Sequence, residues 1–194
     1  MVTMSLATID SLARMSIEKA QRSAVAIVIG SAGSLLVLAY VALGALQVLV
    51  LNPLAAVPDR TLPEIYRDAA AANEPFAVGW VVAFAVIGSA LSVGNLLIAL
   101  RRRATWRESA ACGFLILMLG APAYFWASFP IGMSIADGFG TSGGDHSGWS
   151  GVLFVVSGCA FLALLLLAIQ AGLRKAARSV GTRRAVADST HSEA

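Results

Sequence analysis

Hydrophobic side chains gather into four long runs that contain no formally charged residue. These runs cover residues 23–58, 75–100, 109–136 and 146–173. A helix needs about 20 mostly apolar residues to cross a hydrocarbon layer about 30 Å thick. Apolar runs of this length are typical of membrane spans and rare in soluble domains. The pattern therefore predicts an all-α integral membrane protein.

We expect the four runs to form an up-and-down bundle of four transmembrane helices. The predicted spans are about 24–51, 76–100, 109–133 and 149–173, within one transmembrane domain over residues 23–173. Since the connection between the second and third spans is short, these two spans are expected to be antiparallel neighbours.

Three prolines are expected to shape the spans. Asn52-Pro53 predicts the end of the first span, because proline has no backbone donor and restricts the residue before it. Pro122 cannot donate to the carbonyl of Met118, which predicts a kink in the third span. Pro130 predicts the end of that span.

Two segments outside the spans are predicted to form short interfacial helices. Residues 1–22 read as a cytoplasmic amphipathic segment, because apolar residues recur at spacings of three and four; a frayed polar tail is the alternative. The apolar positions of this segment are Val2, Leu6, Ile9, Ala13, Ile17 and Ala20. After the first span, Thr61-Leu62-Pro63-Glu64 fits a capping box and predicts a short helix on the outer surface.

Charge predicts the orientation. The chain is 58% hydrophobic and only 13% charged, and twelve of its fourteen basic residues lie in segments 1–22, 101–108 and 174–194. Because basic residues near span ends are retained in the cytoplasm, we expect both ends to be cytoplasmic, with residues 174–194 as a basic tail. The formal charge is then +7 inside and −4 outside. The high proportions of arginine and alanine favour a bacterial plasma membrane.

The same distribution identifies the expected partners. Basic segments beside a bilayer are attracted to anionic lipid headgroups, so the basic pI of about 9.2 reflects topology and predicts no nucleic-acid partner. Aromatic residues near the span ends fit an interfacial belt. The residues of this belt are Trp80, Trp106, Tyr124, Trp126, Phe129 and Trp149.

Small side chains recur along one face of the first span and one face of the second. In lipid, helices associate where small residues allow close backbone approach, so these two faces predict a tight helix pair. The predicted packing residues are Ala26, Gly30, Gly33, Ser34, Gly88, Ser92 and Asn95, with Ala85, Ser89 and Ala99 beside them. The fourth span carries a weaker face of this kind, formed by Gly151, Val155, Gly158 and Leu162.

Few residues offer reactive chemistry. The cores of the predicted spans hold no ionisable side chain, which argues against a proton-coupled transporter. Asp137, Asp145 and His146 could ligate a metal on the outer face, but their spacing matches no metal motif and a solvated loop is favoured. No cofactor is predicted. Cys112 and Cys159 are interpreted as small buried hydrophobic residues.

Three functional hypotheses follow. The first is a non-catalytic multi-pass membrane protein that serves as an accessory or scaffold subunit and binds another membrane protein. The second is a passive or facilitated transporter of a small solute, suggested by Pro122 and the glycines near it. The third is an enzyme of the outer face that uses Asp137, Asp145 and His146.

Overall fold

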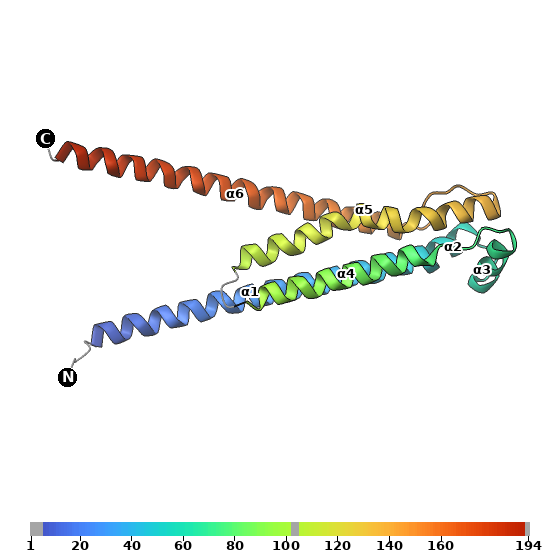
Figure 1. Ribbon diagram of the computed structural model, residues 1–194, viewed down its shortest axis with the longest axis horizontal. Helices are drawn as coiled ribbons and strands as arrows, with labels where there is room; N and C mark the ends of the chain where they lie inside the picture. The colour runs from blue at the N-terminus through green and yellow to red at the C-terminus, as the bar shows by residue number, and fades with distance from the viewer. Residues whose placement is uncertain (1–5, 102–104, 193–194) are drawn as a thin grey trace.

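The computed structural model describes residues 6–101 and 105–192, and over these ranges the regular elements are all helices. Four of them are long: α1 (Leu6–Leu46), α4 (Val78–Ala99), α5 (Trp106–Phe139) and α6 (Trp149–Ser192) (Figure 1). The prediction of an all-α membrane bundle is confirmed, because four helical stretches are long and apolar enough to cross a bilayer. These stretches are Ala24–Ala56, Val78–Ala99, Trp106–Phe139 and Trp149–Ala177. The predicted roles of Val2, Arg102, Arg103 and Glu193 lie outside the described residues.

The first membrane helix does not end at Asn52-Pro53 as predicted. α1 passes into a π-helical turn, η1 (Gln47–Leu51), and then into α2 (Asn52–Ala56). Pro53 lacks an N–H, so it cannot donate to the carbonyls of Val48 and Leu49, which lie five and four residues earlier at the junction of the π-helical turn and α2. The hydroxyl of Tyr66 donates to the carbonyl of Leu49 at 2.9 Å. A side chain of α3 thus supplies a hydrogen-bond donor at the point where proline removes one.

Tyr66 belongs to α3 (Leu62–Ala71), the predicted short helix of the outer connection. Its capping box is confirmed: Glu64 Oε2 accepts from the backbone N–H of Thr61 at 2.8 Å and from the Thr61 hydroxyl at 2.7 Å. These hydrogen bonds lower the pKa of Glu64. Partial burial raises the pKa of Tyr66. Ile65 and Ala69 are fully buried and hold α3 against the bundle.

α5 is also longer than expected, since it passes through both Pro122 and Pro130 and ends at Phe139. The predicted end at Pro130 is therefore wrong. Proline removes a single hydrogen bond, whereas Ile131 and Ile135 in the next turns are completely buried in the bundle. Burial of these side chains outweighs the lost bond, so packing continues the helix.

The N-terminal segment is likewise continuous with the first span. α1 runs from Leu6 to Leu46 without interruption, so residues 6–22 form no separate helix of their own. α6 extends in the same way to Ser192, well beyond its apolar part. At a rise of about 1.5 Å per residue, each of these two helices is roughly 60 Å long. Both therefore exceed the thickness of the hydrocarbon core about twofold.

α1 lies at the centre of the packing, in contact with both α4 and α5, while α6 packs chiefly along α5. Figure 1 shows the two chain ends at the same end of the molecule, where α6 diverges from α1. The opposite end is closed by α2, α3 and the loop between α5 and α6. The bundle is thus close-packed around α1 and leaves one side of α6 uncovered.

Candidate functional site

The contact between α1 and α4 contains the predicted packing residues. Gly30 lies so close to Ala99 that an added Cβ would overlap the Ala99 methyl group. Gly88 lies against Val41 in the same manner. Ala26 is completely buried. At these points glycine lets the two backbones approach, which is how helices associate in lipid.

Hydrogen bonds cross the same contact. Ser34 Oγ donates to the carbonyl of Ser92 at 3.0 Å, and Ser92 Oγ donates to the carbonyl of Ser34 at 2.8 Å. Asn95 Nδ2 donates to Ser34 Oγ at 3.1 Å and to the carbonyl of Gly30 at 3.2 Å. The pair is therefore joined by polar bonds as well as by close packing, in a region without water to compete.

Asn95 also reaches toward α5. An added Cβ on Gly33 or on Gly113 would lie 3.4 Å or 3.6 Å from Asn95 Nδ2, so the amide sits between two glycines. Within the described part of the chain, Asn95 Oδ1 and Ser109 Oγ are buried without a hydrogen-bond partner. A cavity of about 260 Å³ adjoins Ser109, Gly33 and Gly113. Of these two unpaired oxygens, that of Ser109 belongs to a residue that lines the cavity.

A second group of polar side chains holds the loop between α5 and α6 against the bundle. The hydroxyl of Tyr124 donates to Asp145 Oδ1 at 3.0 Å. Asn52 Oδ1 accepts from the backbone N–H of His146 at 2.6 Å. Gln47, in the π-helical turn, is fully buried and donates to the carbonyl of Ser147 at 3.4 Å. Tyr124 was predicted to belong to the interfacial aromatic belt. Its side chain is instead buried and holds this loop against the bundle.

Two of the three candidate metal ligands make separate hydrogen bonds. Asp145 is bonded to Tyr124, while His146 Nε2 lies 3.0 Å from the carbonyl of Ser142. Asp137 is exposed near the end of α5. Over the described ranges, no three His, Cys, Asp or Glu side chains are close enough together to hold a metal ion. The arrangement supports a clamped loop rather than a ligand set.

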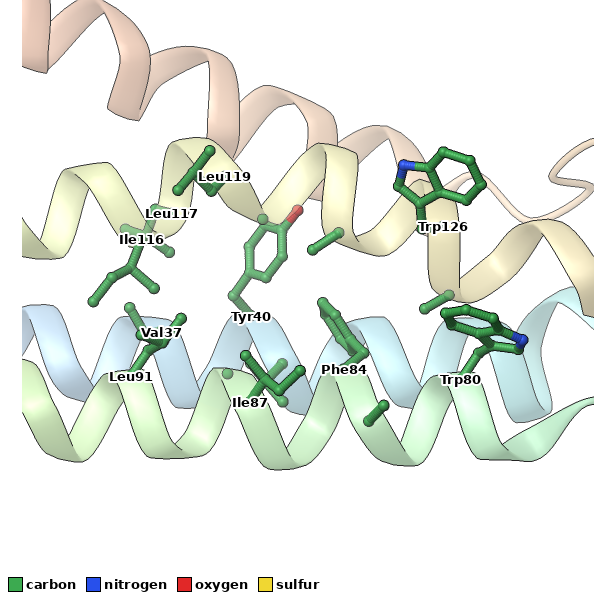
Figure 2. A pocket seen from close by; sticks show the side chains of 16 residues that line it. Val37, Tyr40, Trp80, Phe84, Ile87, Leu91, Ile116, Leu117, Leu119 and Trp126 are labelled. Atoms are coloured by element: carbon green, nitrogen blue, oxygen red, sulfur yellow. The ribbon is translucent and has the colours of Figure 1, made fainter.

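Another feature that the sequence did not predict is an apolar crevice between α4 and α5, with α1 at its floor (Figure 2). Its volume is about 220 Å³. Figure 2 shows Trp80 and Trp126 at one end and Leu91 and Ile116 at the other. The lining is formed by Val37, Tyr40, Val41, Trp80, Ala83, Phe84, Ile87, Gly88, Leu91, Ile116, Leu117, Leu119, Gly120, Ala123, Trp126 and Ala127.

Small side chains create this crevice. Ala83 and Gly88 of α4 and Gly120 and Ala123 of α5 belong to its lining. The ring of Tyr40 fills part of the space, because an added Cβ on Gly120 would lie 2.7 Å from its Cε1. Small residues on the second and third spans are visible in the sequence, but only the relative rotation of the helices shows that some of them face a gap.

Tyr40 and Ser157 form a bond that the sequence did not suggest. Ser157 Oγ of α6 donates to the carbonyl of Leu117 at 2.8 Å and lies 3.1 Å from the Tyr40 hydroxyl. This serine joins α6 to both α5 and α1 by polar contacts. In the sequence, the one indication of such a contact is that Ser157 is a polar residue among the apolar residues of the fourth span.

α6 presents a different surface on its other side. Ser150, Leu153, Ser157 and Ala160 face the bundle and are buried. The predicted small-residue face lies on the opposite side of the helix and is exposed. Its members are Gly151, Val155, Gly158 and Leu162. Cys159, beside this face, is also exposed, contrary to the expectation of a buried cysteine.

Comparison with known proteins gives no further assignment, since no protein-family model, no curated protein and no solved structure matches the chain. The geometry of the described residues offers three features that could serve a function: a polar helix contact, an apolar crevice and an uncovered face of α6.

Proposed function

We propose that this multi-pass membrane protein is a non-catalytic subunit of a membrane complex, and that it binds a partner helix through the uncovered face of α6. The observation that carries this proposal is the contrast between its glycines. Gly30, Gly88 and Gly120 all touch a neighbouring helix, whereas nothing lies within 4 Å of a Cβ placed on Gly151 or Gly158.

Glycine within a helix costs about 0.5–1 kcal/mol relative to alanine, so its presence is favoured where another backbone approaches. Gly151 and Gly158 are seven residues apart and thus share one side of α6. Val155 and Leu162, which flank them, are 65% and 57% exposed. A partner helix that packed on this face would bury both side chains and use both glycines for close approach.

A non-catalytic role is supported by the contacts that Asp145 and His146 make. Asp145 accepts a hydrogen bond from Tyr124, and the ring of His146 lies beside Ser142. These contacts hold the outer loop in place. Their arrangement supports a structural role for the residues that the enzyme hypothesis would need.

For orientation we propose cytoplasmic ends in a plasma membrane. Support comes from three basic residues: Arg101 follows the end of α4, and Arg174 and Lys175 lie near the end of the apolar stretch Trp149–Ala177 of α6. Anionic headgroups would attract them there. In this orientation α3 and the loop after α5 face outward.

The proposal is tested by extracting the chain from its native membrane in a gentle detergent and measuring its mass by native mass spectrometry. We expect a stable complex with another membrane protein or with a second copy. Gly158→Leu should weaken it about tenfold, the effect of losing about 1.4 kcal/mol. Ala168→Leu, an exposed small residue on the flank of α6, is the matched control and should leave the complex intact.

Two results would contradict the proposal. One is a monomer in every mild detergent, together with solute flux after reconstitution in liposomes, which would favour the transporter. The other is equal loss of the complex in Gly158→Leu and Ala168→Leu, because the effect would then have no relation to the glycine face.

A further inference from the structure

We propose that the crevice between α4 and α5 is a binding site for one hydrocarbon chain of a membrane lipid, taken from the leaflet on the α3 side of the bundle. This site is separate from the uncovered face of α6, and its opening, depth and chemistry all fit such a chain.

The crevice opens sideways into the bilayer. Its floor is buried: Val37, Tyr40 and Leu117 are at most 5% exposed. Its rim is exposed, with Ile87 at 59% and Leu119 at 51%. A cavity whose floor is closed and whose rim faces outward from membrane-spanning helices meets the acyl chains of the surrounding lipid.

The depth of the crevice matches one leaflet. Trp80 marks its outer end and Leu91 its inner end (Figure 2). At about 1.5 Å per residue, these two positions on α4 are separated by about 16 Å. Half of a hydrocarbon core about 30 Å thick is about 15 Å. A chain that enters at the two tryptophans would therefore reach the bilayer midplane.

The chemistry selects a hydrocarbon occupant. The one polar side-chain atom at the floor, the Tyr40 hydroxyl, is already bonded to Ser157 at 3.1 Å. Water needs several polar partners in a cavity, and an apolar cavity stays dry. An unfilled void would leave its walls without dispersion contacts. An acyl chain supplies those contacts, and the indoles of Trp80 and Trp126 lie where a headgroup would sit.

The first test measures retained lipid. The full chain is reconstituted in vesicles of phosphatidylcholine and phosphatidylglycerol, then exchanged into lipid-free detergent and weighed by native mass spectrometry. We expect one phospholipid to remain per chain. Filling the crevice with Ala83→Phe and Ala123→Phe together should reduce retention at least tenfold. Ala39→Phe, at an exposed position of α1 outside the lining, is the control and should retain lipid like the parent.

The second test uses the unmodified chain, so a folding defect cannot affect it. Phosphatidylcholine with a photoreactive group in mid-chain is added to the same vesicles, and the labelled peptides are identified. We expect labelling concentrated on residues 80–91 and 116–127. Labelling that is no stronger there than on the exposed face of α6 would overturn the proposal. So would equal lipid retention by the crevice-filled variant and its parent.

Discussion

At the residue scale, hydrogen-bond accounting explains features that hydropathy cannot. Pro53 was expected to end a helix, yet the Tyr66 hydroxyl takes over the carbonyl that proline leaves free. The sequence shows both residues, but their pairing depends on how α3 folds back. In contrast, the faces of α1 and α4 that contain Gly30 and Asn95 could be predicted, because small residues at helical spacing allow helices to pack closely in lipid.

The contact of Gly30 with Ala99 gives the first prediction. Gly30→Ala should destabilise the bundle by about 1–3 kcal/mol, because the added methyl group would overlap Ala99 and force the helices apart. Gly94→Ala is the control: nothing lies within 4 Å of a Cβ at that position, so it should be neutral or slightly stabilising. Unfolding in mixed detergent micelles measures both. Equal stability of the two variants would refute close packing at Gly30.

The bond between Tyr66 and Leu49 gives the second prediction. Tyr66→Phe should cost about 1–3 kcal/mol, since it leaves a partly buried carbonyl unpaired. In a Pro53→Ala background the restored N–H can donate to that carbonyl, and the same Tyr66→Phe change should cost clearly less. A double-mutant cycle measures the difference. Additive effects would show that the hydroxyl does not replace the missing proline donor.

At the element scale, the number and kind of helices were predictable and their ends were not. Long apolar runs without charge fix four spans, because any other fold would leave them in water. The ends of α2 and α5 depend on tertiary contacts. Near Pro53 the Tyr66 hydroxyl donates to the carbonyl of Leu49. Beyond Pro130 the next turns of α5 bury Ile131 and Ile135 in the bundle. The crevice was missed for the same reason, since it arises from helix rotation.

The capping box of α3 gives a pH prediction. Because hydrogen bonds with Thr61 lower the pKa of Glu64, the ionised carboxylate is favoured in the folded state. Its contribution to α3 is therefore present above the ordinary carboxyl pKa and is lost as the pH falls through the lowered value. Hydrogen exchange at the Thr61 amide, corrected for the intrinsic rate, should show protection that declines in acid.

Glu64→Gln is the control for this pH effect. Glutamine can still accept the capping bond but does not titrate, so protection at Thr61 should be independent of pH over the same range. If the variant and the parent lose protection together as the pH falls, the carboxylate of Glu64 is not responsible.

At the scale of the whole molecule, the bundle is packed unequally. Of the residues in the most apolar window of each span, 39% are buried in Ala24–Ala56, 28% in α5, 22% in α4 and 17% in α6. α6 therefore has the smallest buried share and the most surface left for a partner. Both the lipid site and the partner face require four crossings, and the proposed orientation places the α3 end outside.

Cysteine labelling in intact cells tests this topology most directly. In a background of Cys112→Ala and Cys159→Ala, single substitutions place one thiol at each end of the bundle. The positions, all exposed, are Ala72→Cys and Ser142→Cys at the α3 end, and Thr105→Cys and Ala177→Cys at the other end.

The account predicts that a membrane-impermeant maleimide labels positions 72 and 142 in intact cells. It predicts that positions 105 and 177 react only after the membrane is permeabilised. Labelling of 105 or 177 from outside would reverse the orientation, and labelling of only one of positions 72 and 142 would contradict four crossings.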